Sequence, residues 1–200
     1  RRDQAAVDRL AARVSAYTGL DPEYVRRSGG RIETSDYLRE RWRGSGRIGS
    51  YYDSNVTAYD PFPWSTQRKS GDPILDAIIA PTTSAMVDFV TRTVGWKVDG
   101  RYEALSGDVG EGWENAGAIE STTDLRKSVA IDPKLKVLIV HGYDDLSCPY
   151  FASVLIVDQM PPMGTAGRVQ VKVYPGGHMF YSRPDSGAAL RRDVMAMYGA

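Results

Sequence analysis

Asp145 and His178 are two side chains whose types and surroundings are typical of a catalytic pair. Asp145 lies in the turn-rich stretch 142–149, and Gly176-Gly177 directly precede His178, which lets the backbone turn sharply before the imidazole. In acyl transfer, an imidazole takes the proton of a serine hydroxyl and returns it to the leaving group, while a buried carboxylate holds the ring in the useful tautomer. The pair therefore predicts nucleophilic acyl chemistry once a serine is supplied.

A predicted strand leads into each of these two side chains. Residues 137–140 form a continuous apolar run, typical of a strand buried on both faces, and residues 169–173 alternate valine with polar residues. Predicted helices over 149–160 and 184–198 follow the strands. This order indicates a parallel sheet with right-handed crossovers, so the aspartate and the histidine should meet at one edge. Two strands cannot form a stable buried sheet, so further strands are expected from elsewhere.

The part before residue 131 is predicted to be mainly helical. Gly19 is placed to end a helix, Asp21-Pro22 to begin one, and Pro81 to end or kink one at Ala80. The predicted helices are 3–18, a segment from Asp21 to Gly29-Gly30, a segment capped by Ser35, residues 72–80, residues 82–94, and a short stretch around 125–129 capped by Thr122 or Thr123.

Residues 44–71 lack periodicity and are rich in Gly, Ser, Tyr, Asp and Pro, which is typical of a long packed or functional loop. Its aromatic side chains have two interpretations. They either pin the loop to the body of the protein or form a wall that faces a substrate. These residues are Tyr51, Tyr52, Tyr59, Phe62 and Trp64.

Two motifs surround the predicted strand ends. The first reads Gly142-Tyr143-Asp144-Asp145, with Pro149 four residues after Asp145, and the second reads Gly176-Gly177-His178-Met179. They resemble the G-x-x-D-x-x-x-P and G-x-G-H-M forms in the final third of serine carboxypeptidases, particularly the bacterial ones. Weaker similarity to the helical cap of that family lies in Tyr17-Thr18-Gly19-Leu20, Arg47-Ile48-Gly49 and Trp113-Glu114.

The resemblance implies an incomplete α/β-hydrolase fold. Residues 1–131 would be the helical cap with its connecting loops, and residues 132–200 the last parallel strands and helices of the core. Carried over by motif, Asp145 is the triad acid and His178 the triad base. Asp144 is the competing candidate for the triad acid. The spacing of four residues between Asp145 and Pro149 matches the family motif and favours Asp145. The alternative role of Asp144 is to cap the next helix or to bind a backbone amide.

Three other residues lie in or near the two motifs. Met179 resembles a family residue that lines the site of the leaving amino acid. Cys148 stands where some relatives have a cysteine near the substrate, and its alternative interpretation is a small buried thiol. His141 ends a predicted strand without a partner motif, so we expect it to pack or to form hydrogen bonds.

The resembled family also has a nucleophile elbow, G-x-S-x-G, which is missing from these 200 residues. The resemblance therefore implies that the serine, the oxyanion hole and the groups that bind the terminal carboxylate lie upstream of Arg1, in the missing N-terminal part of the same protein. The isolated chain is then expected to be inactive.

Composition narrows the possible partners. The 25 basic and 25 acidic residues cancel, which argues against nucleic acid or anionic lipid as a partner. No run of 18 apolar residues is present, so no transmembrane helix or membrane partner is expected. A single cysteine excludes an intrachain disulfide, and two histidines without a metal-ligand spacing argue against a metal site. No cofactor is expected either.

The expected function is serine-type carboxypeptidase action on a peptide with a free C-terminus. One alternative is other acyl chemistry on the same framework, in an esterase, another peptidase or an acyltransferase, because function depends on the substrate groups. A second alternative is a non-catalytic binding domain that lacks the nucleophile. The compartment is open, and the resemblance alone favours an extracytoplasmic location.

Overall fold

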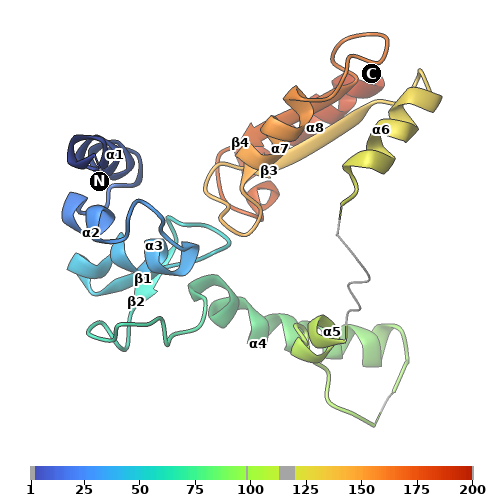
Figure 1. Cartoon of the computed structure of the whole chain (residues 1–200). Helices are drawn as coiled ribbons and strands as arrows, with labels where there is room; N and C mark the ends of the chain where they lie inside the picture. The colour runs from blue at the N-terminus through green and yellow to red at the C-terminus, as the bar shows by residue number, and fades with distance from the viewer. Residues whose placement is uncertain (1–2, 98, 113–119, 200) are drawn as a thin grey trace.

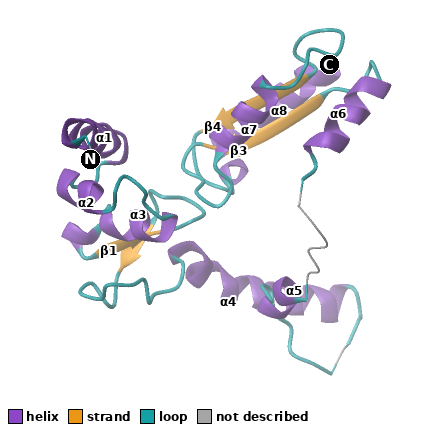
Figure 2. Cartoon of the chain, in the orientation of Figure 1, coloured by secondary structure: helices purple, strands orange, loops and turns teal. Residues whose placement is uncertain are grey.

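The computed structural model describes residues 3–97, 99–112 and 120–199, and it is a mixed helical and sheet structure (Figure 1). Figure 2 shows that helices dominate, with strands in two small sheets. The residues Trp113 and Glu114, on which part of the cap resemblance rests, lie outside the described residues. The elements are, in order, α1 (Gln4–Thr18), α2 (Pro22–Arg27), α3 (Thr34–Glu40), η1 (Arg43–Ser45), β1 (Arg47–Gly49), β2 (Thr57–Tyr59), α4 (Pro73–Asp88), η2 (Phe89–Thr93), α5 (Gly107–Glu111), α6 (Thr122–Ile131), β3 (Val137–Gly142), α7 (Tyr150–Asp158), β4 (Val169–Tyr174), η3 (Phe180–Ser182) and α8 (Pro184–Tyr198).

The first two helices begin and end where their local signals predict. The Asp3 side chain accepts a hydrogen bond from the Ala6 backbone at the start of α1, and Gly19 ends that helix in the left-handed conformation at φ 70°. Asp21 caps α2, whose first residue is Pro22. A small apolar core joins the two helices. It contains Ala11, Leu20 and Val25, with Val14, Tyr24, Ile32 and Tyr37 packed against it.

The third helix differs slightly from its prediction. Glu33, rather than Ser35, occupies the N-cap position of α3, without a side-chain cap hydrogen bond. The reason is that the Glu33 carbonyl already accepts a hydrogen bond from the Tyr37 nitrogen, which starts the helix two residues earlier. The stretch expected to be irregular also contains β1 and β2, which pair as a short antiparallel hairpin.

Helix α4 continues through Pro81, so the prediction that a helix ends at Ala80 is wrong, and the alternative of a kink there stays a prediction. Proline removes one intrahelical donor, but none of the α4 residues is buried, and water can satisfy the carbonyl that loses its partner. With η2 it forms a helix from Pro73 to Thr93 that is long and apolar enough to cross a membrane by length and composition alone. This differs from the expectation of no such helix, and no membrane contact follows from that criterion by itself.

Strands β3 and β4 form the second sheet and run parallel, as the strand–helix–strand–helix order predicts. Their register pairs Val137 with Val169 and Gly142 with Tyr174, so both strands end at the same edge. The expectation that residues 137–140 are buried on both faces is wrong in this structure, because these residues are half-buried. Among the described residues, β4 is the only strand paired with β3, which leaves its other edge without a neighbour.

Candidate active site

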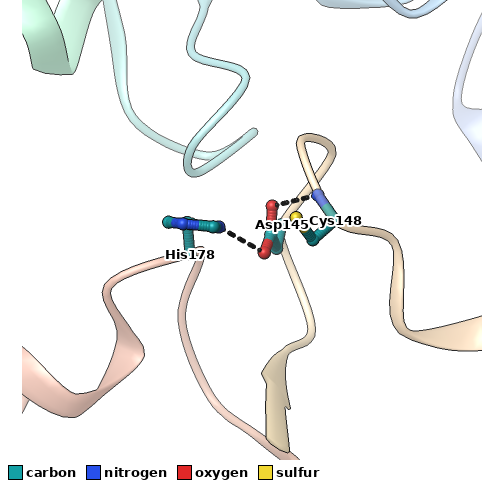
Figure 3. A group of neighbouring side chains, drawn as sticks. All are labelled: Asp145, Cys148 and His178. Carbon is teal, nitrogen blue, oxygen red and sulfur yellow. Dashed lines mark hydrogen bonds and ion pairs between the residues drawn. The ribbon is translucent and has the colours of Figure 1, made fainter. Parts of the chain in front are cut away.

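Asp145 and His178 lie side by side at the carboxyl ends of the parallel strands. Asp145 follows β3 and His178 follows β4, and the Nδ1 atom of His178 lies 2.9 Å from Oδ2 of Asp145 (Figure 3). This is a hydrogen bond between an imidazole and a carboxylate. The spatial pairing that the sequence predicts is therefore present.

Two backbone amides fix the carboxylate of Asp145. Its Oδ1 atom accepts hydrogen bonds from the nitrogens of Ser147 and Cys148, each at 2.9 Å. Only 4% of the residue is exposed. Because Oδ1 is held by these amides, Oδ2 is directed at the imidazole, and the carboxylate cannot rotate freely away from it.

The glycines at the strand ends make this close approach possible. A Cβ on Gly142 would lie 2.1 Å from the Gly177 carbonyl oxygen, and a Cβ on Gly177 would lie 1.9 Å from the Tyr52 carbonyl oxygen. Gly176 has φ 119°, a conformation that other residues rarely adopt. The turn before His178 therefore requires glycine for two reasons: a left-handed backbone and room for a neighbouring main chain.

That neighbouring main chain is residues 50–54, which we call the rim loop. Its Tyr52 carbonyl accepts a hydrogen bond from the His178 nitrogen at 2.6 Å, and the Tyr52 ring meets the imidazole edge-on with centroids 5.4 Å apart. The Tyr51 carbonyl accepts hydrogen bonds from Leu146 and Ser147 at 3.0 and 3.1 Å. The rim loop thus contacts both segments that carry the candidate pair.

Side chains also hold the rim loop. Asp72, the N-cap of α4, accepts hydrogen bonds from the Ser50 hydroxyl at 2.7 Å and from the Tyr51 nitrogen at 2.8 Å. On the other side, Arg183 donates to Asp53 at 2.6 Å. One carboxylate therefore both starts a helix and positions the loop that contacts His178.

The aromatic cluster of residues 51–64 divides between its two interpretations. Tyr51 and Tyr52 belong to the rim loop and pin it, as the first interpretation predicts. Tyr59 and Trp64 are strongly exposed, so they do not pin the loop, and the substrate-facing interpretation stays a prediction for them. The sequence does not predict the contact of Tyr52 with the imidazole, because the two residues are far apart in the chain. The group of aromatic residues around Tyr52 is the one sequence feature that could have pointed to it.

Cys148 and Met179 flank the pair. Cys148 is exposed, so its interpretation as a small buried thiol is wrong. Its position near the substrate stays a prediction. Met179 is half-buried and follows His178 directly, and its role at the leaving-group side also stays a prediction.

The other two candidates, His141 and Asp144, form hydrogen bonds within the fold. His141 lies 3.0 Å from the Cys148 carbonyl oxygen through Nδ1 and 2.9 Å from the Ser153 hydroxyl through Nε2, which confirms its hydrogen-bonding role. Asp144 contributes its backbone, donating to Gly176 and accepting from Ser54. Within the described ranges its carboxylate has no hydrogen-bond partner, so the capping role predicted for it is not seen.

The arrangement can accept a proton at one atom. Nδ1 of His178 is engaged by Asp145, while Nε2 has no hydrogen-bond partner among residues 3–97, 99–112 and 120–199, and 39% of the side chain is exposed. A cavity of about 550 Å³ lies at the opposite ends of the strands, lined by Lys136, Leu138 and Gln170, and is remote from this chemistry.

Comparison of the chain with protein-family models, with curated proteins and with solved structures gave no match.

Proposed function

We propose that this chain provides the acid and base residues of a serine-type acyl hydrolase that acts as a carboxypeptidase. The observation that carries the proposal is the 2.9 Å contact between His178 Nδ1 and Asp145 Oδ2 at the carboxyl ends of two parallel strands. Ligand sites of parallel sheets lie at this edge. The Nε2 atom has no hydrogen-bond partner within the described residues, so it is free to receive a serine proton.

In the proposed reaction, Nε2 of His178 removes the hydroxyl proton as the serine oxygen attacks the carbonyl carbon of the scissile peptide bond. The imidazolium then gives this proton to the departing amine, and an acyl-enzyme remains. A water molecule repeats the sequence and releases the acid and the serine. Asp145 keeps the Nδ1 proton in place and stabilises the imidazolium, while the amides of Ser147 and Cys148 hold its carboxylate.

The nucleophile is proposed to come from the part of the protein upstream of Arg1. Two observations support this. The sequence contains no G-x-S-x-G elbow. The strand β3 is half-buried and has a single neighbour among the described strands, which suits a sheet that receives further strands on its free edge. Residues 1–131 would then be the cap, and the isolated chain is expected to be inactive.

The narrower assignment to carboxypeptidases rests on the motifs around Asp145 and His178, because the proposed triad alone is shared by many acyl hydrolases. Met179 would line the site of the departing amino acid. A free C-terminal carboxylate on the peptide is the feature that separates this activity from that of an esterase or an endopeptidase.

The test uses the protein expressed from its full reading frame. It would be labelled with a fluorophosphonate probe, as the wild type and as His178→Ala, and assayed on an N-blocked dipeptide, its C-terminal amide and its methyl ester. The proposal predicts labelling that depends on His178 and a preference for the free carboxylate over the amide. Labelling that is equal in both proteins would remove the histidine from the mechanism, and a preference for the ester alone would favour esterase chemistry.

A further inference from the structure

Asp145, Cys148 and His178 form a cluster of side chains of the types that bind metal ions, and the proposed hydrolase does not use the cluster in that way. Each residue offers one ligand atom, an oxygen, a sulfur and a nitrogen, and these three atoms all lie within 4.8 Å of one another (Figure 3). Local spacing motifs for metal sites do not include this set, because Asp145 and Cys148 occupy one turn and His178 comes from the end of the next strand. The fold, not the sequence spacing, brings them together.

The three donor atoms suit one class of metal ion. A thiolate, an imidazole nitrogen and a carboxylate oxygen are the ligands that Zn²⁺ uses, at about 2.3 Å for sulfur and about 2.0–2.2 Å for nitrogen and oxygen. Tetrahedral bonds of that length separate nitrogen from oxygen by about 3.3 Å and sulfur from either by about 3.6 Å. The observed separations, 2.9 Å between Nδ1 and Oδ2 and at most 4.8 Å overall, require only small side-chain shifts.

The surroundings also favour binding at this cluster. The amides of Ser147 and Cys148 orient the Asp145 carboxylate through Oδ1 and leave Oδ2 available. Hydrogen bonds of this kind around a ligand raise metal affinity. Cys148 is exposed and can rotate toward the ion, which has open access from solvent.

We propose that Zn²⁺, or another divalent ion that prefers sulfur and nitrogen, binds Asp145 Oδ2, Cys148 Sγ and His178 Nδ1, with water in the fourth position. Binding removes the thiol proton, and the imidazole proton is carried on Nε2 instead of Nδ1. The ion takes the place of the hydrogen bond between His178 and Asp145.

This has a consequence that rests on the proposed function. With the ion bound, the Nε2 atom carries a proton and cannot accept one from a serine, so the metal-bound and catalytic states exclude each other. The ion would act as a reversible inhibitor that competes for the acid–base pair itself, and Cys148 is the residue that makes this competition possible without belonging to the proposed triad.

The test measures metal binding on the full 200-residue chain and needs no substrate. Zn²⁺ binding would be followed by equilibrium dialysis with metal analysis, and Co²⁺ would be added as a spectroscopic probe. Because Cys148 is the one cysteine of the chain, a thiolate-to-cobalt charge-transfer band reports on that residue alone. We expect one ion per chain, and we expect Cys148→Ser and His178→Ala to weaken binding at least about tenfold and Cys148→Ser to abolish the band.

Asp145→Asn removes a proposed ligand, and Asp144→Asn is its matched control. The Asp144 carboxylate is adjacent in sequence and outside the cluster, so its replacement should leave binding unchanged, whereas Asp145→Asn should weaken it. Circular dichroism would verify that each variant is folded. Binding that is absent in the wild type, or that survives Cys148→Ser at full affinity, would overturn the metal site. The hydrolase is tested separately, by comparing fluorophosphonate labelling of the wild type and His178→Ala in the protein expressed from its full reading frame. The two proposals can therefore fail independently.

Discussion

The backbone nitrogen of His178 donates a hydrogen bond to the carbonyl oxygen of Tyr52 at 2.6 Å. The candidate base is therefore positioned by the rim loop, which belongs to the N-terminal part of the chain, as well as by its own strand. Asp72 holds the other side of this loop through Ser50 and Tyr51, so α4 is linked to the site by hydrogen bonds. The site is assembled by both halves of the sequence.

Gly177→Ala should destabilise the fold and displace His178. The added Cβ would lie 1.9 Å from the Tyr52 carbonyl oxygen and 2.5 Å from the Asp53 Cβ, far inside contact distance, so a main chain must move. We expect a loss of about 2 kcal/mol in the free energy of unfolding, typical of overpacking at a tight contact. Thermal and urea unfolding would measure it.

The control for this substitution is Gly44→Ala. Nothing lies within 4 Å of a Cβ at Gly44, and its backbone is not left-handed, so the free energy of unfolding should change by less than about 0.5 kcal/mol. If Gly177→Ala were as stable as the control, the close contact between Gly177 and Tyr52 would be wrong.

Arg183→Gln should lower the free energy of unfolding more than the replacement of an ordinary surface arginine does. Arg183 pairs with Asp53 at 2.6 Å, and the Asp53 side chain is only 7% exposed, so removing the guanidinium leaves a buried carboxylate with one partner fewer. We expect a loss of about 1–2 kcal/mol in the free energy of unfolding. Arg92→Gln is the matched comparison.

Arg92 pairs with Asp88 at 2.7 Å on an exposed helix face. Solvent screens such pairs, so Arg92→Gln should change the free energy of unfolding by less than about 0.5 kcal/mol. Equal effects of the two substitutions in urea unfolding would show that the Asp53–Arg183 pair does not join the rim loop to the C-terminal part.

Elements with local signals could be predicted from the sequence. The end of α1 at Gly19 and the start of α2 at Asp21-Pro22 depend on backbone conformations and caps that neighbouring residues determine. The parallel pairing of β3 and β4 followed from the order of strands and helices, and this order also predicted that Asp145 and His178 meet.

Features that depend on distant contacts or on solvent could not be predicted in this way. The contact between Tyr52 and His178 has no signal in sequence spacing. Pro81 lies inside α4, where no residue is buried, so water can satisfy the carbonyl that loses its hydrogen-bond donor. The hairpin β1–β2 has strands of three residues each, too short for an alternating pattern to stand out. The half-burial of β3 depends on which strands and helices cover it.

Tyr174→Phe tests the link between β4 and α8. The Tyr174 hydroxyl donates to Asp193 at 2.7 Å. This hydrogen bond, helped by the nearby charge of Lys172, holds the pKa of Asp193 below its ordinary value. The pKa of Tyr174 is raised, mainly by burial of its hydroxyl and also by the same hydrogen bond. Phenylalanine keeps the ring stacked on Phe180 and removes the donor, at a cost of about 1 kcal/mol in the free energy of unfolding at neutral pH.

The pH dependence of this cost has a definite sign. Because the folded-state pKa of Asp193 is depressed, its contribution is present above the ordinary carboxyl pKa of about 4 and is lost as pH falls through the folded value. The pKa of Tyr174 is raised, so its contribution to the free energy of unfolding is fully present below the ordinary tyrosine pKa of about 10. That contribution is lost as the pH rises through the folded-state pKa. Urea unfolding of both proteins should therefore converge at low pH, and a difference that stays constant from pH 7 to 3 would contradict this pairing.

Asp145→Asn should abolish most of the proposed activity without unfolding the protein. Oδ1 of Asp145 accepts two backbone hydrogen bonds, so the asparagine oxygen will take that place and its NH₂ group will point at His178 Nδ1. The ring must then accept at Nδ1 and carry its proton on Nε2, the atom that should remove the serine proton. In the protein expressed from its full reading frame we expect kcat to fall about 10³- to 10⁴-fold with little change in KM. Asp144→Asn alters the neighbouring carboxylate and should leave kcat within about twofold, because Asp144 contributes only its backbone to the site. If the two variants exchanged these effects in steady-state kinetics, Asp144 would be the triad acid instead.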